Sequence, residues 1–128
     1  MILIEGGNIW PESEPFDQAI APELDQATDR LLQGTGLKVH IIGSAATPTP
    51  GKMSGDLDVM TDMDLVKKFF DIPKMKKLAD EDKAARQALD DYLQSKGIKT
   101  YKAGVTVHIL LPFQSKFHQV DIKVVRKA

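Results

Sequence analysis

Two segments near the C-terminus place apolar residues at every second position, and this pattern constrains the fold more than any other feature of the chain. The first segment carries Val105, Val107, Ile109 and Leu111, and the second, over residues 117–125, carries Val120, Ile122 and Val124. Successive side chains of a strand point to opposite faces of its sheet, so each segment predicts a strand with one apolar face. Residues 112–116 predict the turn between them.

Helical spacing elsewhere predicts the elements that cover the apolar face. One helix is expected within residues 20–34, with Pro22 in its first turn and Gly34 as its stop. A second should follow Thr61, which has capping-box spacing with Asp64, and a third should cover residues 82–96. Shorter strands are expected at 37–42, 56–60 and 98–102. The predicted fold class is therefore α+β, a mixed or antiparallel sheet with helices packed mainly on one face.

The length of 128 residues predicts one domain: an irregular segment over 1–19, a leading helix over 20–34 and a core over 37–125. Because the chain has no cysteine, a disulfide framework and cysteine chemistry are excluded. The apolar run at the N-terminus, residues 1–4, is too short for a signal peptide or a membrane span. We therefore expect a cytoplasmic protein with no membrane partner.

Charge is unevenly distributed although the net charge is only −1. Residues 1–34 hold seven acids and one base, residues 35–95 ten acids and nine bases, and residues 96–128 seven bases and one acid, Asp121. The near-neutral total argues against a protein that coats nucleic acid non-specifically, which needs a positive field over much of its surface. Asp121 is the only acid in a basic region.

Three aspartates lie on predicted strands, where a carboxylate is unfavourable unless something holds it there. Asp56 and Asp58 are two residues apart and share a face, and Asp121 lies on a strand that could pair beside theirs. Carboxylate oxygens are the ligands that Mg²⁺ prefers, so the three aspartates are candidate metal ligands. Two ions about 4 Å apart could activate an attacking oxygen and stabilise a leaving phosphate. The three histidines, in contrast, show no metal-ligand spacing.

The spacing of these residues resembles the signature of the DNA polymerase beta nucleotidyltransferase superfamily. Gly43-Ser44 ends a predicted strand, Ser54-Gly55-Asp56-Leu57-Asp58-Val59 follows after nine residues, and Val120-Asp121-Ile122-Lys123-Val124-Val125 is similar to the later strand of X-family polymerases. The resemblance implies a polymerase beta-like palm in which Gly43 and Ser44 bind nucleotide phosphates. It also implies that Asp56, Asp58 and Asp121 bind two Mg²⁺ or Mn²⁺ ions, and that Asp121 helps to deprotonate the attacking hydroxyl.

Further binding residues are expected around this motif. Ser54 and Gly55 belong to it, and Lys123 is similar to a basic residue at that place in polymerase strands. X-family polymerases have an arginine-containing stretch after the Gly-Ser turn, but this chain has no arginine between Arg30 and Arg86. Lys52 could supply a cation there, as a point charge without the planar fork of arginine.

The resemblance implies a nucleotidyltransferase that moves NMP from an NTP, such as ATP, to a hydroxyl on RNA, protein or a small molecule, with release of pyrophosphate. A complete templated DNA polymerase is not expected, because the chain ends three residues after Val125. Two alternatives remain open: a catalytically silent nucleotide-binding or interaction module of the same fold, and a nucleic-acid-binding protein that uses the basic C-terminal third. A partner subunit or a homodimer could help to shape the acceptor site.

Overall fold

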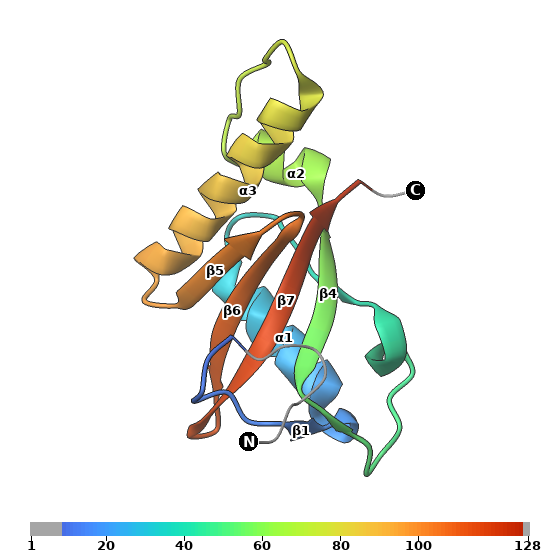
Figure 1. Cartoon of the computed structure of the whole chain (residues 1–128). Helices are drawn as coiled ribbons and strands as arrows, with labels where there is room; N and C mark the ends of the chain where they lie inside the picture. The colour runs from blue at the N-terminus through green and yellow to red at the C-terminus, as the bar shows by residue number, and fades with distance from the viewer. Residues whose placement is uncertain (1–8, 127–128) are drawn as a thin grey trace.

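The computed structural model describes residues 9–126, in which five strands form one mixed sheet (Figure 1). In spatial order they are β2 (His40–Ile41), β4 (Asp56–Asp62), β7 (Lys116–Val125), β6 (Thr106–Phe113) and β5 (Lys99–Ala103). The central pair β4 and β7 is parallel, and every other neighbouring pair is antiparallel. The mixed sheet that the sequence predicts is confirmed.

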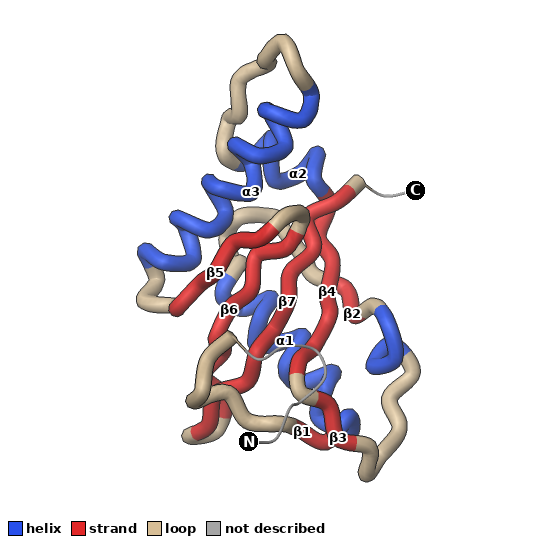
Figure 2. Tube along the Cα trace, in the orientation of Figure 1, coloured by secondary structure: helices blue, strands red, loops and turns tan. Residues whose placement is uncertain are grey.

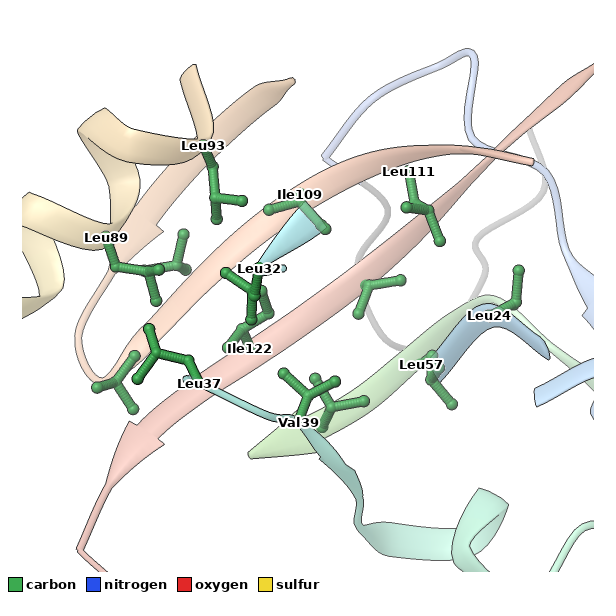
Figure 3. Close-up of a cluster of buried hydrophobic side chains, with 14 of the residues drawn as sticks. Leu24, Leu32, Leu37, Val39, Leu57, Leu89, Leu93, Ile109, Leu111 and Ile122 are labelled. Carbon is green, nitrogen blue, oxygen red and sulfur yellow. The ribbon is translucent and has the colours of Figure 1, made fainter. Parts of the chain in front are cut away.

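Three helices, α1 (Ala21–Leu31), α2 (Met63–Phe69) and α3 (Leu78–Ser95), accompany the sheet, and α1 lies behind it in Figure 1. Side chains from α1 and α3 join those of the strands in one buried cluster (Figure 3), which includes Leu24, Leu57, Leu89, Leu93, Ile109 and Ile122. Burying each such side chain stabilises the fold by about 1.5–3 kcal/mol. Helices α1 and α3 therefore cover one face of the sheet and leave the opposite face for other contacts.

The segment that precedes α1 is more ordered than the sequence suggests. Residues 1–8 of the expected irregular segment lie outside the described residues, but β1 (Phe16–Asp17) pairs antiparallel with β3 (Met53–Ser54), as Figure 2 shows. A 3₁₀ turn, η1 (Gln18–Ile20), then leads into α1. The prediction of an irregular segment over 1–19 is therefore wrong for residues 16–19. Phe16 accounts for the order, because its side chain is buried in the core at 2% exposure.

The N-terminal segment also crosses part of the face opposite the helices. The backbone N–H of Glu14 donates to the carbonyl of Phe117 over 2.8 Å, and the N–H of Ile9 donates to Gln119 Oε1 over 2.8 Å. Leu110, which is on this face of β6, is buried at 3% exposure. Gln119 also donates to Asp121 Oδ1 over 2.9 Å, so the crossing reaches the edge of the part of this face that carries the three aspartates.

The strand expected at 37–42 is shorter than its composition indicates. Only His40 and Ile41 pair with β4. Leu37 and Val39 are buried, yet the backbone N–H of Val39 donates to the carboxylate of Asp29 over 2.8 Å. A side chain of α1 thus takes a donor that a longer strand would have offered to its neighbour.

Two helices begin at residues other than those predicted. The N-cap of α2 is Asp62, whose carboxylate accepts from the N–H of Asp64 over 2.9 Å, and Thr61 is instead a buried residue of β4. Helix α3 begins at Leu78 and not at residue 82, and its first turn holds Asp80 and Glu81. Acidic residues stabilise a helix N-terminus. Leu78 is exposed, so it does not extend the buried apolar stripe from which the start of the helix was predicted. None of the helices within residues 9–126 is long and apolar enough to cross a membrane.

Asp82 of α3 ties the end of β7 to the helices. Arg126 donates to both of its oxygens over 2.9 and 2.6 Å, and Lys67 of α2 forms an ion pair with it over 2.7 Å. These hydrogen bonds hold the pKa of Asp82 well below its usual range. Asp82→Asn should therefore lower the free energy of unfolding by about 2 kcal/mol at pH 7. The difference in free energy of unfolding between wild type and variant should shrink below about pH 4, where Asp82 of the unfolded wild-type chain takes up a proton.

Asp25 of α1 provides a control of opposite sign. Its Oδ1 is buried without a hydrogen-bond partner, and burial together with the negative charge of Asp29 raises the pKa of Asp25 to about 6. Because the pKa of Asp25 is higher in the folded than in the unfolded state, the free energy of unfolding falls as the pH rises towards and through 6. Asp25→Asn should therefore increase stability at pH 8 and change it little at pH 4, as measured by urea unfolding at both values. A loss of stability at pH 8 would contradict this assignment.

Candidate active site

The three aspartates meet on the open face of the central parallel pair. Asp58 of β4 and Asp121 of β7 are Cα partners in the register, and Asp56 lies two residues before Asp58 on the same face. Each offers a carboxylate oxygen, and these oxygens all lie within 4.8 Å of one another. The structure thus brings together all three residues that the sequence analysis singled out.

The cluster is strained electrostatically, because three acids share a half-buried site. Burial, hydrogen bonding with Asp121 and the negative charges of Asp121 and Asp58 raise the pKa of Asp56 to about 8. Lys123 opposes this rise only in part, and its Nζ lies 3.5 Å from Asp58 Oδ1. A divalent cation held by the carboxylate oxygens would relieve the repulsion, so the donor set fits Mg²⁺ or Mn²⁺.

The Gly-Ser turn lies beside the acids. Directly after β2 the chain forms a 3₁₀ turn, η2 (Gly43–Ala46), and the N–H of Ile42 donates to the carbonyl of Asp58 over 2.9 Å. Gly43 has a φ of 74°, a conformation that residues with a Cβ rarely adopt. A Cβ at this position would lie 3.7 Å from Asp58 Oδ2. Glycine therefore lets the turn pass close to the carboxylates without backbone strain.

A pocket of about 380 Å³ opens between this turn and β4. Its lining residues are Ile42, Ser44, Ala45, Met53, Ser54, Gly55, Asp56 and Asp58. None of them is basic. Ser44, Ser54 and Gly55 thus line the pocket, whereas Gly43 belongs to the adjoining turn and is not among the lining residues.

The two lysines expected at the site take different places. Lys123 faces the aspartates from β7, through its contact with Asp58. Lys52 is exposed and is not among the residues that line the pocket. Its backbone carbonyl instead accepts from the N–H of Gln18 over 2.9 Å.

Sequence reasoning missed three residues at this site: two that contact Asp121 and one that contacts a serine of the pocket. His108 Nδ1 lies 2.6 Å from Asp121 Oδ1, and Gln119 Nε2 donates to the same oxygen over 2.9 Å. The register places His108 opposite Asp121 on the next strand, so only the pairing of β6 with β7 reveals the contact. Gln18 reaches the pocket from the N-terminal segment and hydrogen-bonds to Ser54. Nothing in the local sequence of that segment signals this role.

The chain matches no known protein-family model and no curated protein sequence. Its fold is similar to that of Leishmania infantum polymerase beta, solved in a ternary P/T complex, with a TM-score of 0.57 and 17% identity. That match covers 91% of this chain and 45% of the polymerase beta chain, so this chain spans less than half the length of that neighbour. A cytoplasmic RNA terminal U-transferase matches with a TM-score of 0.39 and 16% identity, over 84% of this chain and 28% of its own. The likeness to polymerase beta confirms the polymerase beta-like fold.

The geometry predicts that the protein binds a divalent cation in the absence of any nucleotide. Titration with MnCl₂ or MgCl₂ should raise the melting temperature, by the equivalent of about 2.7 kcal/mol at a concentration 100 times Kd. Asp58→Asn and Asp121→Asn should lose most of this rise. Asp91→Asn, at an exposed carboxylate on α3, is the matched control and should keep it. An equal rise in all four proteins would show that the ions act elsewhere.

Proposed function

We propose that the protein is a metal-dependent nucleotidyltransferase that moves NMP from an NTP to a hydroxyl acceptor and releases pyrophosphate. The observation that carries the proposal is the convergence of Asp56, Asp58 and Asp121 beside a pocket lined by two serine hydroxyls. The polymerase beta-like fold is consistent with this chemistry.

The three carboxylates would hold two divalent ions. When bound, such ions neutralise charge on the phosphates and favour ionisation of an attacking hydroxyl. With all three carboxylates ionised and two divalent ions bound, the formal charge of the site would be +1, which suits an anionic substrate. Because none of the pocket-lining residues is basic, protein cations cannot replace this contribution at the pocket itself.

The pocket would bind the triphosphate. Ser44 and Ser54 offer hydroxyl donors, and Gly55 in the pocket lining carries no side chain that would keep a ligand from the backbone. Lys123 would contribute positive charge at the side of the pocket that faces β7, since its ammonium already lies near Asp58. Positioning and charge compensation account for most of the catalysis of phosphoryl transfer, so a small site of this kind is sufficient chemically.

In the reaction, the acceptor oxygen forms a bond to the α-phosphorus while the bond from that phosphorus to the bridging oxygen breaks. Pyrophosphate leaves, and the proton of the acceptor hydroxyl passes to Asp121. His108 and Gln119 would orient this carboxylate, because both contact its Oδ1. Hydrogen bonds from neighbouring residues to a metal-binding carboxylate fix the direction in which that carboxylate faces the metal or the substrate. The proposed acceptor is a hydroxyl group on RNA, protein or a small molecule.

Transfer of label from α-³²P NTPs tests the proposal directly. Wild-type protein, offered all four NTPs with Mg²⁺ or Mn²⁺ and a panel of RNA, protein and small hydroxyl acceptors, should label one acceptor class and lose the activity in EDTA. Asp121→Asn should lower the rate by at least about 100-fold, which is the scale of lost general-base catalysis. Asp91→Asn should retain full activity.

Each contrary result identifies an alternative. Metal-dependent NTP binding without transfer to any acceptor would contradict the enzyme and support a silent nucleotide-binding module. Salt-sensitive RNA or DNA binding that survives the loss of all three aspartates, with no NTP binding, would support a nucleic-acid-binding protein that uses the basic C-terminal third.

A further inference from the structure

A polar side chain lies fully buried beneath the proposed triphosphate pocket. Gln18 in η1 is 0% exposed, yet its amide has two donors and an acceptor to satisfy. Its partners are the backbone N–H of Thr49, at 3.0 Å, and the hydroxyls of Ser54 and Ser44, at 3.0 and 3.5 Å. All of these belong to the segment that runs from the Gly-Ser turn to β3.

The direction of each hydrogen bond follows from these partners. A backbone N–H can only donate, so the group facing Thr49 must be the carbonyl oxygen Oε1. The amide nitrogen Nε2 then faces the serines and donates to Ser54 and, over the longer distance, to Ser44. The orientation of the amide is therefore determined by the network around it.

This direction has a consequence for the hydroxyls. A serine oxygen that accepts from an amide N–H keeps its own proton free to rotate away from that donor. Ser44 and Ser54 both line the pocket, so each hydroxyl proton is free to turn towards a ligand there. With the opposite amide orientation, the serines would donate to Gln18 and present lone pairs to the pocket.

We propose that Gln18 is a positioning residue that makes Ser44 and Ser54 hydrogen-bond donors to the oxygens of a bound triphosphate. The proposal rests on the proposed function, because it assigns a role within the same site. Asp56 and Asp58 form part of the pocket wall and no lining residue is basic, so directed donors matter more here than in a pocket with an arginine. Gln18 acts through the serines and does not itself contact the ligand.

A double-mutant cycle separates this role from simple support of the loop. The probe is inorganic tripolyphosphate with Mn²⁺, measured by calorimetry, so that neither the base nor the acceptor needs to be known. Gln18→Met keeps the length of the side chain but removes both donors, and it should weaken tripolyphosphate binding by about tenfold, the scale of a lost hydrogen bond. In the Ser44→Ala/Ser54→Ala background the same change should cost less than about twofold, because coupled residues are not additive.

Asp17→Ala provides the matched control. The carboxylate of Asp17 accepts from the N–H of Gly51 in the same loop and, as the N-cap of η1, from the N–H of Ala19, and it touches neither serine nor the amide of Gln18. This variant should bind tripolyphosphate within about threefold of wild type, since it leaves the directed donors in place. Mn²⁺ binding alone should be unchanged in all variants, and unfolding curves should confirm that each protein is folded at the assay temperature.

The outcomes distinguish this inference from the proposed function. If Gln18→Met weakens binding equally with and without the serines, or if Asp17→Ala matches its effect, Gln18 only supports the loop and the inference is wrong while the proposed function stands. If the wild-type protein with Mn²⁺ binds neither tripolyphosphate nor any NTP, the proposed function fails and the inference fails with it.

Discussion

The parallel pairing of β4 with β7 is the constraint on which the rest of the structure depends. It sets Asp58 directly beside Asp121 on the open face and, through the same register, sets Leu57 beside Val120 on the buried face. The apolar side provides the stability, at about 1.5–3 kcal/mol for each buried side chain. This burial offsets part of the cost of holding three acids together on the other side, where burial and the neighbouring carboxylates raise the pKa of Asp56.

Segments outside this pair complete the site. The Gly-Ser turn approaches from the β2 edge, His108 contacts Asp121 from β6, and Gln18 reaches the pocket from a segment before the first helix. Each contributes a contact that β4 and β7 lack: a close backbone approach, a partner for Asp121 Oδ1 and a hydrogen bond to Ser54. The pocket is consequently polar, although it lies against a sheet with an apolar core. Its lining includes two acidic residues and no basic one, so a cation is favoured as the first ligand.

The sequence predicted the parts of the fold that local periodicity controls. The strands β4, β6 and β7 and the helix α1 lie close to their expected positions, because apolar residues recur in each of them with a single period. Predictions were wrong where a single side chain competes with a regular element. Asp29 takes a backbone donor from the strand expected at 37–42, Asp62 caps α2 in place of Thr61, and the buried Phe16 orders a segment that reads as irregular. The contacts of a single side chain leave no periodic pattern in the sequence, so they cannot be predicted from periodicity.

The amino-acid sequence by itself determined that Asp56 and Asp58 share a face and that Asp121 lies on a strand with its own apolar face, because side chains alternate along any strand. The tertiary structure decided that those strands are neighbours, in a register that aligns Asp58 with Asp121. It also decided that Gln18 and His108 belong to the same site, and that Lys52 does not line the pocket. The physical reason is range: alternation is a property of each residue and its neighbours along the chain, whereas register and long-range hydrogen bonds depend on how the whole core packs.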